Sequence, residues 1–164
     1  MSVLPIVQWP DARLSEVCAP VGSADLGSLI SDMFDTMYAA KGRGLAGPQV
    51  GAMLRLFVMD AGWKEGARTP LVMINPEIMP QGDALTIKEM CLSVPEIIVP
   101  VSRPESVIAR WTDAGGNPKE ARFEGAESRI IQHEFDHLEG KLHFDRVSQS
   151  TREALEAPYL KALA

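Results

Sequence analysis

The chain has 164 residues, of which 46% are hydrophobic and 23% are charged, and this composition predicts one globular domain over residues 1–164. The net charge of −6 argues against a nucleic-acid-binding surface, and no stretch approaches the roughly 18 apolar residues of a membrane span. The beginning, MSVLPIVQWPDARL, has no cationic segment followed by an apolar run, so we expect a cytoplasmic protein.

Apolar residues recur at spacings of three and four between Asp25 and Ala40, which predicts a helix with one buried stripe. The segment that follows, KGRGLAGPQVG, has four glycines and one proline in eleven residues. It predicts a tight loop that ends the helix and exposes its backbone.

Six short segments rich in β-branched and large apolar residues come next, separated by turn residues. These predicted strands are residues 54–60, 71–75, 84–89, 96–101, 105–112 and 120–125. A helix is predicted from about Ala126 to Glu139, and a last one from about Gln149 to Leu163 despite Pro158. The order of elements predicts an α+β fold, with a mainly antiparallel sheet packed on a central helix.

The segment IIQHEFDHLEG, residues 130–140, contains two histidines four positions apart with Glu134 after the first. On a helix, His133 and His137 lie one turn apart on the face that also carries Ile130, so both imidazoles point inward. Two core histidines bonded to backbone are one interpretation. An HExxH motif arises by chance in well under about 1% of chains of this length, so a metal site is favoured.

A catalytic metal site typically has three protein ligands and an open position for water, so a third ligand is needed. Candidates along the chain are Glu139, His143, Asp145 and, upstream, Cys91. A thiolate is a strong, soft ligand, but a lone cysteine is equally a small buried apolar residue. Spacing alone leaves these alternatives open.

Three ordered motifs resemble those of the peptide deformylase family. GRGLAGPQV (42–50) is similar to its GxGLAAPQ, EMCLS (89–93) to its EGCLS, and QHEFDHLEG (132–140) to its QHExDHLxG. The opening VLPIVQWPDARL and INPEI (74–78) extend the resemblance to about residues 3–147. The resemblance implies a deformylase-like fold and Cys91 as the third metal ligand. It implies Fe²⁺ as the metal, with Zn²⁺, Ni²⁺ or Co²⁺ able to replace it.

The activity that the resemblance implies is hydrolysis of the formyl group of N-formylmethionine on nascent or short polypeptides, with release of formate. Glu134 is then the general base. Gln49 and the backbone N–H of Leu92 are then the donors to the oxyanion, although Gln49 alone would be an ordinary loop amide. Gly42 and Gly44 let the loop backbone approach the peptide, since no Cβ stands in the way.

The chain departs from the family pattern at three positions near the expected site. Met90 replaces a glycine beside Cys91, where its long side chain would fill part of the methionine pocket. Gly47 replaces an alanine. Arg129 stands where the family carries an apolar pocket residue, so it must reach solvent or an acidic group. We expect formamide hydrolysis to be retained with an altered substrate preference or rate.

Two other functions compete with this interpretation. One is a peptidase or other amide hydrolase that uses the same HExxH chemistry, and the other is a metal protein that binds peptide ends without turnover. Ribosome association finds little support, because the C-terminal segment STREALEAPYLKALA has only Arg152 and Lys161 as cations. Direct nucleic-acid and membrane partners are not expected.

Overall fold

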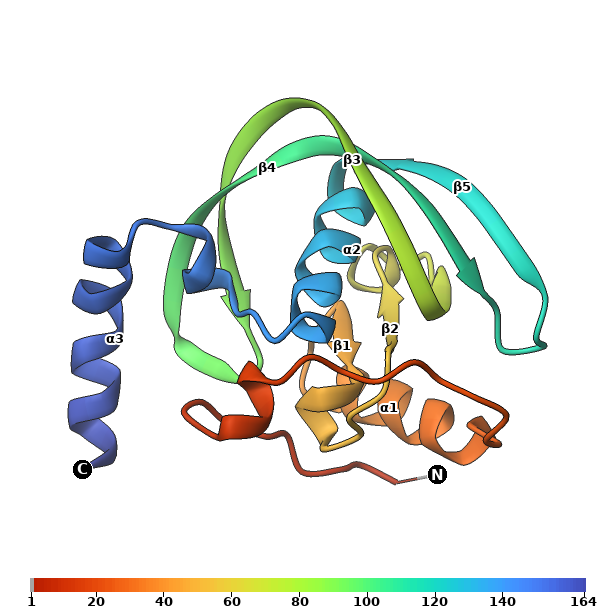
Figure 1. The fold of residues 1–164 in the computed structure, drawn as a ribbon, viewed down its shortest axis with the longest axis horizontal. Coiled ribbons are helices and arrows are strands. Elements are labelled where there is room, and N and C mark those ends of the chain that lie inside the picture. Colours follow the sequence, from red (N-terminus) through yellow and green to blue (C-terminus); the bar gives the residue numbers. More distant parts are fainter. Residues whose placement is uncertain (1) are drawn as a thin grey trace.

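The computed structural model describes residues 2–164 and has an α+β architecture, as predicted (Figure 1). Its five strands form one antiparallel sheet in chain order. The strands are β1 (Gly44–Ala46), β2 (Leu56–Asp60), β3 (Pro70–Cys91), β4 (Val94–Thr112) and β5 (Pro118–Glu124). The helices are α1 (Gly27–Ala39), α2 (Gly125–Leu138) and α3 (Gln149–Leu163), and short 3-10 turns lie between the elements.

The strands β3 and β4 are long and continuous, so the prediction of four separate strands in this region was wrong. The turn residues that suggested breaks lie at irregularities, where the pairing of β3 with β4 shifts register, as between Gln81 and Ala84. Pro100 and Pro104 lie where β4 pairs with β3 alone, so their missing N–H groups face an unpaired edge. The bends let both strands arch around α2 (Figure 1).

The helix α2 is central because its apolar face is buried under the sheet. Ile131 and Leu138 pack with Phe57, Met73 and Val107, all fully buried. A second cluster joins the turn between β3 and β4 to the segment after α2 and to α3. The sheet and the helix therefore hold each other in place, and the inward face of α2 is fixed relative to the end of β3.

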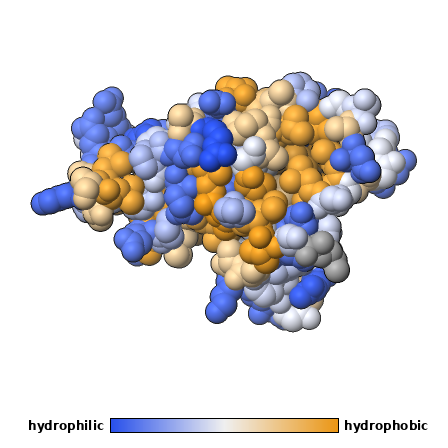
Figure 2. All heavy atoms as spheres, turned by 90° about the horizontal axis from the view of Figure 1, so that it is seen from below, coloured by the Kyte–Doolittle hydropathy of each residue, from blue (hydrophilic) through white to orange (hydrophobic). Residues whose placement is uncertain are grey.

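The helix α3 confirms the helical prediction for residues 149–163, and it projects to one side of the molecule (Figures 1 and 2). It is attached near its start, where the Arg152 guanidinium lies over the Phe144 ring, and again further along, where the Tyr159 hydroxyl donates to the Trp9 carbonyl. Leu160 and Leu163 are exposed on it. Within residues 2–164, no helix is long and apolar enough to cross a membrane.

The glycine-rich segment is more regular than the predicted loop, since Gly44–Ala46 forms β1 and Gly47–Val50 a 3-10 turn. Gly47 is buried against the chain that follows it. A Cβ on Gly47 would lie 2.6 Å from the Ala52 carbonyl oxygen and 2.8 Å from the Leu54 carbonyl oxygen. In this chain the backbone itself therefore occupies the space that an alanine would need.

Asp60 ends β2 and organises the loop after it. Its buried carboxylate accepts hydrogen bonds from the Tyr38 hydroxyl at 2.5 Å and from the backbone N–H of Thr69 at 2.9 Å. Burial opposes ionisation of Asp60, but these donors outweigh it and hold the pKa of the carboxyl below its ordinary value. The loop from Gly62 to Thr69 is thereby tied to α1.

The substitution Gly47→Ala is expected to lower the free energy of unfolding by about 1–3 kcal/mol, because two carbonyl groups must shift to admit the methyl group. Urea unfolding followed by circular dichroism measures this. Gly22→Ala is the matched control, since its Cβ would meet nothing within 4 Å. Equal stability of the two variants would contradict the packing argument.

The substitution Asp60→Asn is expected to cost about 1–3 kcal/mol at neutral pH, because a buried hydrogen-bonded carboxylate loses its charge. A depressed folded-state pKa stabilises the fold above the unfolded-state pKa near 3.9, and this stabilisation is lost as pH falls through the folded-state value. The difference between wild type and variant should therefore shrink below about pH 4. Urea titrations from pH 2.5 to 7 test this, with Asp83→Asn, at an exposed position, as the control. A difference that stays constant over this range would count against the assignment.

Candidate metal centre

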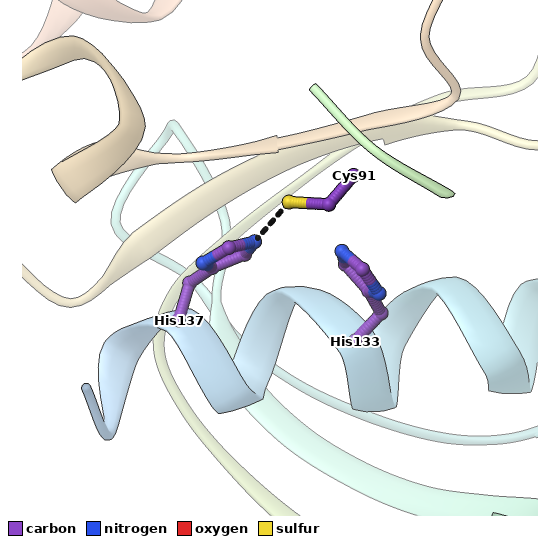
Figure 3. Close-up of side chains that lie close together, drawn as sticks. All are labelled: Cys91, His133 and His137. Atoms are coloured by element: carbon purple, nitrogen blue, oxygen red, sulfur yellow. Dashed lines mark hydrogen bonds between the residues drawn. The ribbon is translucent and has the colours of Figure 1, made fainter. Parts of the chain in front are cut away.

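Cys91, His133 and His137 come together at the end of β3 and the inner face of α2. One possible ligand atom from each lies within 4.8 Å of the others, and the histidine ring centroids are 5.1 Å apart. Figure 3 shows both rings projecting from α2 toward Cys91, whose Sγ is 3.5 Å from Nε2 of His137. One thiolate and two imidazoles make the three-ligand set typical of a catalytic site.

The other candidates for the third ligand are engaged elsewhere. His143 uses Nε2 on the Ile97 carbonyl at 2.9 Å, and its Nδ1 accepts from the Phe144 N–H at 3.0 Å. Asp145 forms an ion pair with Arg152, and Glu139 forms one with Arg55. Within residues 2–164, the grouping therefore favours Cys91, which spacing alone left as one of four alternatives and which the family resemblance implied.

Glu89, two residues before Cys91, holds His133 in position. Its Oε1 lies 2.9 Å from Nδ1 of His133, which leaves Nε2 of that ring free to bind a metal. Its Oε2 accepts from Arg103 and Arg129, each at 2.6 Å. Burial opposes ionisation of Glu89, but hydrogen bonds from His133 and Arg103 outweigh it and hold its pKa far below the ordinary value.

Arg103 also connects Glu89 to a second buried acid, on α2. Its Nη1 donates to Asp136 at 2.9 Å, and Asp136 in turn pairs with Arg146. The sequence provided no signal for Arg146. These partners come from four separate segments, so only the folded chain brings them together.

Glu134 lies beside the proposed ligands in a dry environment. The residue is 5% exposed, and its Oε1 is buried with no hydrogen-bond partner among the described residues. A Cβ on Gly44 would lie 2.6 Å from its Oε2, so only glycine fits there. Burial raises the pKa of the Glu134 carboxyl to about 7. A buried acceptor without a partner next to three ligand atoms fits a metal with a coordinated water.

Gln49 is buried and held in one orientation. Its Oε1 accepts from the Ala46 N–H at 3.0 Å, so its Nε2 faces the site, 3.1 Å from the Ser93 hydroxyl and 3.7 Å from the Cys91 sulfur. The sequence points to Gln49 but not to Ser93. The available signal was a serine two residues after a candidate ligand.

A cleft of about 620 Å³ joins most of the predicted residues. Every predicted site residue except His137 lines it, namely Gly42, Gly44, Gln49, Glu134, Met90, Cys91, Leu92, Arg129 and His133. Met90 is 64% exposed there. Arg129 satisfies the expectation that it reaches an acidic group, because it pairs with Glu89 and also donates to the Leu85 and Val101 carbonyls.

Comparison with known proteins gives a consistent result. The family model described as polypeptide deformylase matches residues 3–153. A peptide deformylase of Alkalilimnicola ehrlichii is 46% identical over 94% of this chain and 88% of its own length. One of Zymomonas mobilis is 45% identical over 98% of this chain and 95% of its own. The crystal structure of peptide deformylase from Ehrlichia chaffeensis in complex with actinonin has a TM-score of 0.91 at 36% identity, covering 99% and 98% of the two chains.

The substitution Glu89→Gln is expected to weaken divalent-metal affinity by about 10–100-fold, because a charged partner orients the His133 ring. Competition with a chromogenic chelator measures the affinity, and circular dichroism checks that the variant folds. Glu77→Gln, at an exposed position of the same strand, is the control. Unchanged affinity in a folded Glu89 variant would rule out this positioning role.

Proposed function

Since this chain belongs to the peptide deformylase family, and is therefore a hydrolase that removes N-formyl groups, we propose that Cys91, His133 and His137 hold its metal. We propose Fe²⁺, with Zn²⁺, Ni²⁺ or Co²⁺ as substitutes. The observation that supports this assignment most strongly is the unpartnered Oε1 of Glu134 next to these three side chains. The proposed substrates are N-formylmethionyl peptides and nascent chains.

When bound, the metal lowers the pKa of its water and polarises the formyl oxygen. Glu134 then accepts the proton of the attacking water, and its buried site with a raised pKa suits a group that must later release that proton. The proton passes to the departing amine as the carbon–nitrogen bond breaks. Water and formamide thus give formate and a free α-amine, and the carboxylate is regenerated.

Gln49 and the backbone N–H of Leu92 stabilise the negative charge that develops on the former formyl oxygen. The Ala46 N–H fixes the Gln49 carboxamide, so the donor requires little reorganisation during the reaction. Gly42 and Gly44 keep the neighbouring backbone open to the peptide. A Cβ on Gly42 would lie 2.7 Å from the Leu92 side chain, so glycine also permits the close packing of this wall.

Met90 bears on the choice between turnover and simple peptide binding. Its side chain is 64% exposed, so it lies largely in solvent and leaves the cleft open. This supports turnover over a role limited to binding peptide ends.

The helix α3 offers little charge for contact with the ribosome. Arg152 is already paired with Asp145 and Glu156, which leaves Lys161 as the free cation of α3 within the described chain. We propose a cytoplasmic location, where nascent chains are available.

The substitution Glu134→Gln is expected to lower turnover of formyl-Met-Ala-Ser by about 10²–10⁴-fold, because the proton acceptor is lost while its volume is kept. Formate release is measured on protein loaded anaerobically with Fe²⁺, and bound metal is measured in parallel. Glu127→Gln, exposed on the same helix, is the control. Full activity in the Glu134 variant would disprove its role, and release of unformylated amino acids by wild type would indicate a peptidase.

A further inference from the structure

The rim of the metal-site cleft is basic although the whole chain has a net charge of −6. Lys41, Lys64 and Lys88 line it, and all three are exposed. Among residues 2–164, none of the three forms an ion pair. Three unneutralised cations around one opening form a local positive field on an otherwise acidic protein.

The two acidic residues of the same cleft do not cancel this field. Glu89 is buried and already paired with Arg103 and Arg129. Glu134 is buried at the reacting end. The adjoining cavity, of about 580 Å³, has Glu105 and Glu124 on its wall together with Arg43 and Arg129, so its charges balance, and the three lysines line only the cleft that holds the metal ligands.

Lys64 is kept at the rim by its neighbours in the chain. The Trp63 Nε1–H donates to the Gly42 carbonyl at 2.9 Å, and Glu65 pairs with Arg43 at 2.5 Å. Both contacts join the short turn Trp63–Glu65 to the glycine-rich wall of the cleft. The ammonium group of Lys64 forms no ion pair within the described chain, and it lies over the Trp63 ring, 5.7 Å from the ring centroid.

Lys41 occupies a backbone conformation that costs energy for a side chain. It follows the C-terminus of α1 with φ of +59°, a left-handed position usually taken by glycine. A residue with a Cβ there costs about 1 kcal/mol relative to glycine. A lysine that is unfavourable for the fold but lines the cleft points to a role in the cleft.

We propose that Lys41, Lys64 and Lys88 make this enzyme prefer formylated polypeptides with acidic side chains at the positions that follow the formylated residue. The inference rests on the proposed function, which places the formylated end at Glu134. A polypeptide held there extends across the same cleft, so its next side chains pass the three ammonium groups. Opposite charges raise the association rate and stabilise the bound peptide, and both effects weaken with salt.

The first experiment compares kcat/KM for formyl-Met-Ala-Ser, formyl-Met-Glu-Glu and formyl-Met-Lys-Lys with wild-type enzyme loaded with Fe²⁺. At about 20 mM salt the ratio of kcat/KM for the acidic peptide to that for the basic peptide is expected to be about ten, because a few exposed charge pairs together contribute that much. At about 0.5 M salt the ratio should approach one. Hydrolysis of the neutral peptide independently tests the proposed function, so the two failures are distinguishable.

Variants assign the preference to named side chains. The double variant Lys64→Gln/Lys88→Gln should bring the ratio of kcat/KM for the acidic and basic peptides close to one, and it should keep turnover of the neutral peptide within about twofold of wild type. Lys41→Gly should reduce the ratio and at the same time leave the protein equally stable or more stable, which no folding defect would produce. Lys161→Gln, exposed on α3, is the charge-matched control and should leave the ratio unchanged.

Equal kcat/KM for the three peptides at low salt would overturn the proposal, as would a ratio that survives loss of the three lysines. Single-stranded RNA added to the assay with formyl-Met-Ala-Ser tests whether the lysines bind nucleic acid instead of acidic peptides. Strong, lysine-dependent inhibition by RNA without discrimination among the peptides would assign the rim to nucleic acid and also overturn it.

Discussion

The carboxylate of Glu89 is the interaction on which the arrangement of the site depends. It lies at the end of β3, 6% exposed, and it binds Arg103 of β4 together with His133 and Arg129 of α2. The strands β3 and β4 and the helix α2 thus meet at two oxygen atoms. Because an unpaired charge at this depth would be costly, the partners cannot separate independently. The orientation of His133 follows from the position of β3.

Buried ion pairs of this kind contribute less to stability than to uniqueness of structure, because desolvation offsets much of the attraction. Here Arg103 extends the pairing to Asp136, which lies on the same side of α2 as Arg129, and Arg146 covers that carboxylate from outside. Ion pairs from β3, β4 and the segment after α2 therefore converge on this side of the helix. That constraint suits a helix whose two histidines must meet a cysteine from another strand at fixed distances.

The three departures from the family pattern have distinct physical explanations. Arg129 is neutralised by Glu89, so a cation in place of an apolar residue leaves no unpaired buried charge. Gly47 accommodates carbonyl oxygens that approach its Cα closely. Met90 projects into solvent at the rim. Met90, Arg129 and the three lysines line the cleft, Gly47 lies in the buried backbone away from it, and the group of Cys91, His133, His137 and Glu134 is intact.

The sequence alone determined the features that depend on local periodicity. These include the helix carrying His133 and His137 on one face, the helix α1, the α+β class and, through three ordered motifs, the family. It indicated that Arg129 reaches solvent or an acidic group, but not that Glu89 is its partner. Short-range spacing carries this information because residues three and four apart on a helix are neighbours whatever the rest of the chain does.

Only the tertiary structure showed that Cys91, which spacing left open and the family motifs implied, lies next to the two histidines, and only it showed how the strands run. Cys91 is 42 residues before His133 in the sequence. It reaches the histidines because β3 continues past the register shifts in its pairing with β4 and ends at Cys91. The same long-range pairing places Arg103 beside Glu89 and tethers Lys64 to the cleft. Such contacts depend on the register between distant strands, which is set by packing against α2 and not by any local pattern.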